Sequence, residues 1–198
     1  MDVETTGLGA SDKIVSFAAI RLNSASLAEE RLDLELMHLV FDPGRESHWR
    51  AEQVHGYSDW LLRHQERFDQ HAEAIWKFIH RGNVIVAHNA SFDSRFVGRE
   101  LVSSGCPPIA RPLYCTMESY RNFGLGGSAS LDAVCGRMGL QRIGKRHGAL
   151  EDDWLAMNIY LAHQGCRLTF ALPNHVDLAP KNLRAVPPAP KGKLPPRA

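Results

Sequence analysis

The sequence predicts an α/β fold in which antiparallel strands come first and alternating helices and strands follow. Residues 14–22 (Ile-Val-Ser-Phe-Ala-Ala-Ile-Arg-Leu) have a β-rich composition, and residues 32–41 alternate leucine with other residues before an apolar end. Together with the short segment Asp2–Glu4 they predict an antiparallel meander, which the turn sequence Asp42-Pro43-Gly44 ends. Helical and strand patterns then alternate, which is the second sign of an α/β domain.

The middle of the chain predicts two helices around a buried strand. Residues 71–80 carry apolar side chains on one face and charged ones opposite, as in an amphipathic helix. Residues 83–87 (Asn-Val-Ile-Val-Ala) are typical of a central strand covered on both faces. A second helix then runs to Gly105. Residues 45–70 are polar, and Ser58 is placed to cap a short helix.

The last part of the folded region predicts a short strand at residues 113–115 and a helix at 131–138 that Ser130 caps. A basic loop occupies residues 142–146, and a further helix runs to about residue 162. Leu155 and Ile159 mark the buried stripe of this helix. We therefore expect Glu151 and Asp153, on either side of Asp152 in the sequence, to face solvent.

Composition predicts one domain over residues 1–165 and a disordered tail over 166–198. The chain has 198 residues, 44% of them hydrophobic, and seven of its eleven prolines fall after residue 170. The net charge is +1, but residues 171–198 carry +4, which leaves −3 on residues 1–170. A mildly acidic body would need cations to bind nucleic acid.

The sequence disfavours a zinc-binding protein and a membrane protein. The four cysteines have no zinc-ligand spacing, and no apolar run is long enough to span a membrane. We therefore expect no membrane association and a cytoplasmic location.

The first motif is Asp2-Val3-Glu4. In a strand, its two carboxylates would point to one side about 7 Å apart along the chain. Such a pair suits a hard divalent cation beside a phosphate, although a solvated strand end gives the same pattern.

Two later stretches offer more carboxylates. Asp93 falls at the carboxyl end of the predicted central strand, where α/β sheets place their ligands, and an N-cap is its other interpretation. Asp152 lies in the first turn of the last helix. Two side chains five residues apart on a helix point about 140° away from each other. His147 can therefore share a site with Asp152 only if it lies in the segment before that helix.

The settings of these residues resemble three motifs of the DEDDh 3′→5′ exonuclease family, which includes proofreading subunits of DNA polymerases. They are Asp-Val-Glu-Thr-Thr-Gly-Leu at residue 2, His-Asn-Ala-Ser-Phe-Asp at 88 and His-Gly-Ala-Leu-Glu-Asp at 147. The resemblance spans about residues 1–163 and implies a ribonuclease H-like fold, a mixed five-stranded sheet flanked by helices.

By this resemblance, Asp2, Glu4, Asp93 and Asp152 would hold two Mg²⁺ or Mn²⁺ ions, and His147 would be the general base. The substrate would be the 3′ end of single-stranded nucleic acid, with DNA favoured over RNA and 5′-monophosphates released. A DNA polymerase is the implied partner. The residues expected to contact the terminal nucleotide are Thr5, Thr6, Leu8, His55 and Phe92, although for His55 a turn or surface position is the other interpretation.

The chain departs from the family pattern at its start. Members have a full apolar strand before the first aspartate, whereas Met1 directly precedes Asp2 here. We expect a shortened first strand to anchor Asp2 and Glu4 less firmly. The alternatives are an RNA-trimming enzyme of the same family and a non-catalytic module that binds nucleic acid or a polymerase.

Overall fold

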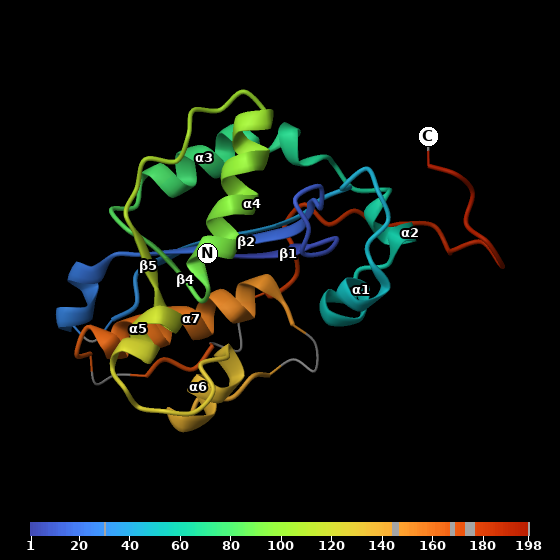
Figure 1. Cartoon of the computed structure of the whole chain (residues 1–198). Coiled ribbons are helices and arrows are strands. Elements are labelled where there is room, and N and C mark those ends of the chain that lie inside the picture. The colour runs from blue at the N-terminus through green and yellow to red at the C-terminus, as the bar shows by residue number, and fades with distance from the viewer. Residues whose placement is uncertain (30, 144–146, 167–168, 173–176, 198) are drawn as a thin grey trace.

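The structure is a computed structural model of the chain and describes residues 1–29, 31–143, 147–166, 169–172 and 177–197. Helices cover both faces of a central group of strands, which gives three layers (Figure 1). One face carries α3 (Ala72–His80) and α4 (Ala90–Ser103); the other carries α5 (Thr116–Asn122), α6 (Leu131–Arg137) and α7 (Ala149–His163). The remaining helical segments are η1 (Ser24–Glu29), α1 (Trp49–His55), α2 (Asp59–Leu62) and η2 (Phe68–Gln70).

Three strands form an antiparallel sheet in chain order: β1 (Asp2–Thr5), β2 (Ile14–Leu22) and β3 (Leu34–Val40). Asp2 pairs with Ala18, and Ser16 pairs with Val40 on the other side of β2. The register shifts after Glu4, where β1 turns away into the following loop. The prediction that three antiparallel strands come first is confirmed.

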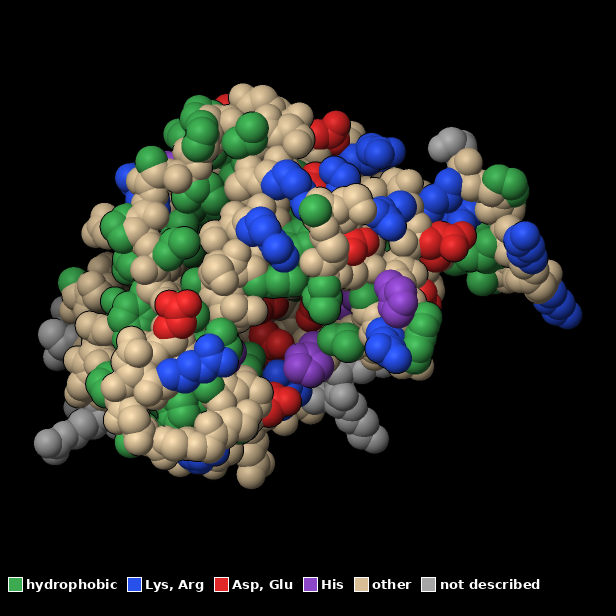
Figure 2. All heavy atoms as spheres, in the orientation of Figure 1, with side chains coloured by type: hydrophobic (Ala, Val, Ile, Leu, Met, Phe, Trp, Pro, Cys, Tyr) green, Lys and Arg blue, Asp and Glu red, His purple; other side chains and the backbone are tan. Residues whose placement is uncertain are grey.

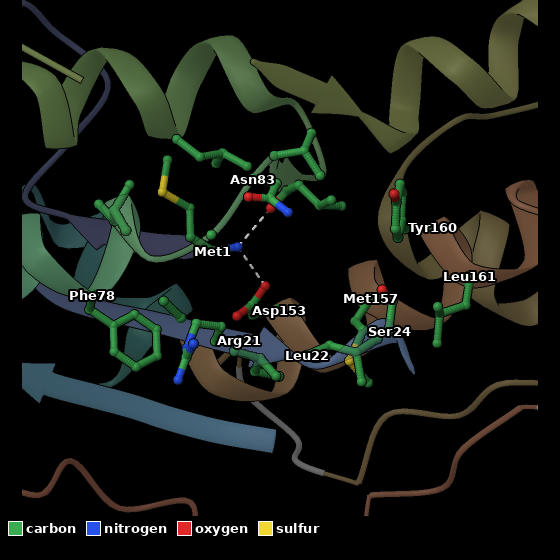
Figure 3. A pocket seen from close by; sticks show the side chains of 17 residues that line it. Met1, Arg21, Leu22, Ser24, Phe78, Asn83, Asp153, Met157, Tyr160 and Leu161 are labelled. Atoms are coloured by element: carbon green, nitrogen blue, oxygen red, sulfur yellow. Dashed lines mark hydrogen bonds and ion pairs between the residues drawn. The ribbon is translucent and has the colours of Figure 1, made fainter. Parts of the chain in front are cut away.

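The other two strands, β4 (Ile85–Ala87) and β5 (Leu113–Cys115), pair in parallel. The predicted five strands are present among the described residues, but as ladders of three and two instead of one continuous sheet. The ladders meet where the amino group of Met1 donates a 2.7 Å hydrogen bond to the carbonyl of Val86. A pocket of about 220 Å³ lies between β4 and the end of β2 (Figure 3).

The largest core cluster lies between the antiparallel sheet and helices α3 and α4. Val3 and Phe17 enter it from the sheet, and Ile75 and Phe96 enter it from the helices. Each of these side chains is at most 6% exposed. Their burial fixes β1 against α4, and these two elements carry three of the predicted ligands.

Helix α7 is buried on nearly all sides, so the prediction that Glu151 and Asp153 face solvent is wrong. The two residues are only 6% and 4% exposed. Strands β1, β2 and β4 contact α7, and helices α5 and α6 contact it as well. Asp153 forms an ion pair of 2.6 Å with the amino group of Met1, which offsets the cost of burying its charge (Figure 3).

Helices α1 and α5 were not predicted. The N-cap of α1 is His48, whose Nδ1 accepts a hydrogen bond from the N–H of Arg50. Histidine is not among the usual capping residues, so no capping motif marks the start of this helix. The predicted cap of α2 is confirmed, because the hydroxyl of Ser58 accepts a 3.2 Å hydrogen bond from the N–H of Leu61.

Parts of the predicted tail lie against the domain. The N–H of Val40 donates to Oδ1 of Asn182 at 2.8 Å, and the Val40 carbonyl accepts from Nδ2 of the same side chain at 2.7 Å. The N–H of Lys181 donates to the carbonyl of His38 at 2.9 Å. This segment therefore covers the outer edge of β3, while the boundary at residue 165 stays a prediction.

The sequence also predicted no membrane-spanning segment. Within the described ranges, no helix is both long enough and apolar enough to cross a bilayer.

Candidate active site

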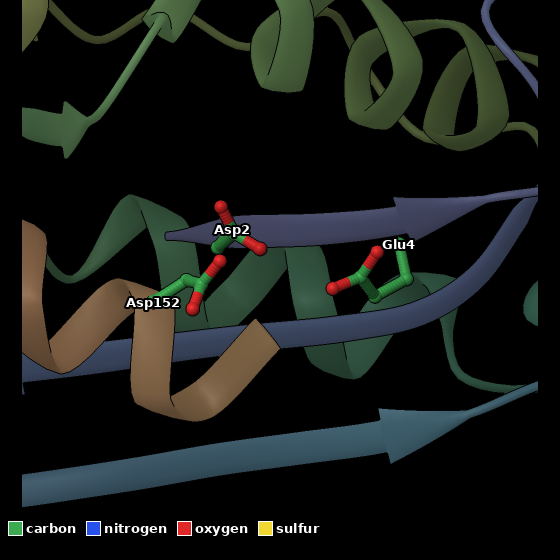
Figure 4. Close-up of side chains that lie close together, drawn as sticks. All are labelled: Asp2, Glu4 and Asp152. Carbon is green, nitrogen blue, oxygen red and sulfur yellow. The ribbon is translucent and has the colours of Figure 1, made fainter. Parts of the chain in front are cut away.

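Strand β1 places Asp2 and Glu4 on one side of the sheet. Side chains two apart along a strand share a face, while Val3 between them packs into the core on the other face. Glu4 is 9% exposed and Asp2 is partly exposed. Both carboxylates lie on the side of the sheet where α7 runs (Figure 4).

The turn from β4 into α4 brings Asp93 to the same region. Strand β4 ends at Ala87, and Asn89 adopts a left-handed backbone with φ of 71°, which asparagine tolerates better than most residues. Helix α4 begins at Ala90, so Asp93 lies in its first turn. Its Oδ1 accepts a 3.1 Å hydrogen bond from the N–H of Val3, which ties α4 to β1.

The segment before α7 brings His147 beside Asp152. Gly148 is the N-cap of α7 with an extended backbone, and its carbonyl accepts a 3.0 Å hydrogen bond from the N–H of Asp152. Nδ1 of His147 lies 3.1 Å from Oδ2 of Asp152. The imidazole is 44% exposed, so it stands at the open side of the site. The structure thus places His147 outside the helix, as the five-residue spacing requires.

Asp2, Glu4 and Asp152 form a compact group of carboxylates. One oxygen of each lies within 4.8 Å of the others (Figure 4). Asp93 stands beside this group, with one of its oxygens engaged by Val3. Several carboxylate oxygens at this spacing are the donor set that Mg²⁺ or Mn²⁺ prefers, so the residues present fit such an ion.

Burial makes these carboxylates costly to ionise. It raises the pKa of Glu4 to about 8, and the charge of Asp152 adds to the effect. Burial and then the charges of Asp93 and Asp152 raise the pKa of Asp2 well above its ordinary value. Burial also raises the pKa of Asp93 to about 7, although the amino group of Met1 opposes the shift. A bound cation would reverse these shifts, because it favours the charged form.

Among the described residues, the side-chain cation of Arg142 reaches this group. Its Nη1 hydrogen-bonds Oδ1 of Asp152, and its Nη2 lies 2.9 Å from Oδ1 of Asp132. Its Nη1 is also 3.7 Å from Oε2 of Glu151. The sequence assigned Arg142 only to a basic loop, because no local pattern links a loop residue to a helix ten positions later. Residues 144–146 of that loop lie outside the described residues.

A pocket of about 460 Å³ opens beside the carboxylates. Its lining includes Glu4 and four of the predicted nucleotide contacts, Thr5, Leu8, His55 and Phe92. Figure 2 shows acidic side chains within a recess on this face and histidine side chains near its rim. The pocket is therefore continuous with the carboxylate group through Glu4.

His55 gives this pocket a polar group. Its side chain is 6% exposed, and its Nδ1 accepts a 3.0 Å hydrogen bond from the N–H of Tyr57. Its Nε2 is buried and has no hydrogen-bond partner among the described residues. Burial lowers the pKa of His55 to about 4, so the ring is neutral at pH 7.

Thr6, the fifth predicted contact, is turned away from this pocket. It is fully buried, its hydroxyl donates to Oδ1 of Asp12 at 2.9 Å, and the same hydroxyl accepts from the N–H of Lys13 at 3.0 Å. Successive side chains at the end of β1 point to opposite sides, so Thr5 and Thr6 do not share the pocket. We assign Thr6 to the structure of the loop.

Comparisons with known proteins show the family to which the chain belongs. The exonuclease family model (RNase_T) matches residues 1–160. DNA polymerase III subunit epsilon of Rickettsia prowazekii (strain Madrid E) is 32% identical over 185 residues, which cover 89% of this chain and 78% of that protein.

Solved structures show the same fold. The nuclease domain of 3′hExo, a DEDDh family member bound to rAMP, has a TM-score of 0.64 at 17% identity and covers 84% of this chain and 92% of that one. Exonuclease X in complex with 5′ overhanging duplex DNA has a TM-score of 0.59 at 22% identity and covers 82% of this chain and 87% of that one. With the family match over residues 1–160 and the three motifs brought to one place, the chain belongs to this exonuclease family and is a DEDDh 3′→5′ exonuclease with a ribonuclease H-like fold.

Proposed function

We propose that this protein removes nucleotides from the 3′ end of single-stranded DNA, with two Mg²⁺ or Mn²⁺ ions, and releases 5′-monophosphates. The observation that supports this proposal most directly is the convergence of Asp2, Glu4 and Asp152 within 4.8 Å, beside a pocket of nucleotide size.

In this proposal Asp2, Glu4, Asp93 and Asp152 hold the metal ions. Such ions would stabilise the charge that develops on the attacked phosphate and lower the pKa of a bound water. The raised pKa of Glu4 supports this assignment, because burial and the charge of Asp152 outweigh the nearby positive charge of Arg142, and a divalent ion would supply more.

His147 acts as the general base in this scheme. Its Nδ1 faces Oδ2 of Asp152, so the neutral ring donates from Nδ1 and keeps its lone pair on Nε2. That nitrogen can take a proton from the attacking water. Asp152 would then stabilise the imidazolium, while the exposed ring edge lets the proton leave to solvent.

The pocket beside Glu4 would hold the terminal nucleotide. Leu8 and Phe92 offer apolar surface for the base and sugar. The buried Nε2 of His55 would hydrogen-bond a sugar or phosphate oxygen, which would satisfy a nitrogen that lacks a partner among the described residues. Thr5 lines the same pocket between these groups.

The preference for DNA and a polymerase partner are proposed from the relatives. The Rickettsia relative is a subunit of DNA polymerase III, and a role beside a polymerase would place this protein in the cytoplasm. An RNA-trimming enzyme is the second candidate, since the 3′hExo domain is bound to rAMP. A non-catalytic module is disfavoured because three converging carboxylates, two of them buried, cost stability and serve no evident packing role.

The test uses matched single-stranded DNA and RNA oligomers with a 5′ label, Mn²⁺, and a parallel reaction in EDTA. The parent should produce a ladder of 3′-shortened DNA that EDTA abolishes, and Glu4→Gln should produce none while keeping its circular dichroism spectrum. Faster shortening of RNA would favour the second candidate. Inertness of the folded parent toward both oligomers would reject the proposal.

A further inference from the structure

Arg142 follows helix α6 and reaches the site from outside the three motifs. Its side chain is 14% exposed, so the guanidinium lies between protein groups instead of extending into solvent. Asp132 of α6 holds one side of it through Nε and Nη2, at 3.3 and 2.9 Å. Its Nη1 turns to Asp152 of α7. The side chain thus bridges two helices and ends at a predicted metal ligand.

Both oxygens of Asp152 have partners in this arrangement. Arg142 binds Oδ1, and His147 lies against Oδ2. A cation that binds Asp2, Glu4 and Asp152 together would therefore have to share or displace one of these partners. Of the two, the arginine carries a fixed positive charge, because a guanidinium stays protonated over the whole working pH range.

The charge of Arg142 also acts on the neighbouring ligand. Its partner Asp152 has a carboxylate oxygen within 4.8 Å of an oxygen of Glu4, so the guanidinium stands close to both carboxylates. The guanidinium therefore offsets part of the repulsion that the carboxylates would otherwise have, as a metal ion would do more strongly. Glu151 adds to the negative surroundings of the guanidinium, with its Oε2 at 3.7 Å from Nη1.

We propose that Arg142 is a built-in counter-cation of the carboxylate group, which offsets the negative charge around Asp152 and competes with a divalent ion for that carboxylate. Arg142 is thus a positioning residue that sets the metal affinity. This inference rests on the metal site of the proposed function. The role proposed for Arg142 makes metal affinity depend on a side chain outside the three motifs.

The test measures Mn²⁺ binding by isothermal titration calorimetry in the full chain and in three variants. Arg142→Gln removes the charge, Arg142→Lys keeps it, and Arg137→Gln is the matched control, because Arg137 is exposed and contacts the carbonyls of Ser128 and Ala133. We expect Arg142→Gln to lower the dissociation constant for Mn²⁺ by about tenfold or more, with Arg142→Lys and Arg137→Gln close to the parent.

Thermal melting gives a second measurement that a purely structural role would not reproduce. Arg142→Gln should lower the melting temperature in EDTA but not in saturating Mn²⁺, because the ion replaces the lost charge. A loss of stability in both conditions, or weaker or unchanged Mn²⁺ binding, would overturn the inference. If Arg142→Gln does not fold, Arg142→Met takes its place, because methionine keeps the apolar part of the arginine side chain and removes the charge. Absence of Mn²⁺ binding by the folded parent would instead reject the metal site of the proposed function, and the inference with it.

Discussion

The N–H of Val3 donates a hydrogen bond of 3.1 Å to Oδ1 of Asp93, so the residue between two predicted metal ligands is fastened to a third. Val3 itself is 6% exposed and packs in the main core. One backbone group thus fixes the distance between β1 and the first turn of α4. The positions of Asp2, Glu4 and Asp93 are therefore coupled, and a change at Asp93 tests both the ligand and the link.

Asp93→Asn should separate these two roles. The amide oxygen can still accept from Val3, but the negative charge is lost, so we expect exonuclease activity to fall about 100-fold or more. The pKa of Asp93 is raised to about 7, so its ionisation costs stability as the pH rises from about 4 through 7. In EDTA at pH 8, the melting temperature of Asp93→Asn should therefore be higher than that of the parent. At pH 5 the difference between the two melting temperatures should be smaller. A lower melting temperature at both values would mean that the charge itself holds the fold.

His147→Gln should reduce catalysis with little change in stability. The imidazole is 44% exposed and its one described polar contact is with Asp152, so the unfolding free energy should change by less than about 1 kcal/mol. Loss of a general base should lower kcat by about 10²–10⁴-fold, measured on labelled single-stranded DNA. His64→Gln, on a ring that bonds the carbonyl of Trp60, is the control and should keep full activity. Parent-like kcat in His147→Gln would remove His147 from the mechanism.

The parts of the site that the sequence predicted are those set by local geometry. The two-residue spacing of Asp2 and Glu4 needs only a strand, and the five-residue spacing of His147 and Asp152 needs only a turn before a helix. The contact of Arg142 with Asp152 was not predictable in this way, because it joins a loop to a helix through tertiary packing.

The same reason explains the errors in the fold. Asp153 was expected to face solvent because it lies off the apolar stripe of α7, but strands and helices pack around this helix on several sides. A helix enclosed in this way does not show one buried face in its sequence. Helix α1 was missed for a local reason, since His48 is an unusual cap.

Leu8→Ala should weaken substrate binding without affecting the chemical step. Leu8 is 78% exposed at the pocket, so the folded protein gains little from its side chain. If it packs on the terminal nucleotide, its loss should raise KM about tenfold and leave kcat unchanged. Leu125→Ala is the matched control, because Leu125 is 67% exposed and lines a different pocket. Equal KM values for the two variants would place the nucleotide elsewhere.

His38 should make stability fall in mild acid. The ring is buried, its Nε2 lies 3.0 Å from Oγ of Ser16, and its Nδ1 lies 2.9 Å from the carbonyl of Leu178. Burial lowers the pKa of His38 to about 4. The unfolded chain therefore binds the proton more tightly, and stability is lost as the pH falls from about 6.5 to 4.

His38→Gln removes this titration. We therefore expect the difference in the free energy of unfolding between parent and variant to decrease by about 3 kcal/mol from pH 7 to pH 4. Urea unfolding at several pH values measures this difference. A difference that stays constant with pH would show that the ring of His38 is not buried in the neutral form.

Asn182 should prove important for the edge of the sheet. Its amide both accepts from the N–H and donates to the carbonyl of Val40, as a neighbouring strand would do. Asn182→Ala should lower the free energy of unfolding by about 1–3 kcal/mol and speed hydrogen exchange at the Val40 amide. The free energy of unfolding of Asn182→Asp should lie between those of the parent and Asn182→Ala, because aspartate keeps the hydrogen-bond acceptor and loses the donor. Lys191→Ala, at an exposed position further along the segment, is the control. If Asn182→Ala exchanges and unfolds like the control, the segment after residue 177 does not hold the edge of β3 in solution, and the predicted disordered tail would be the better description.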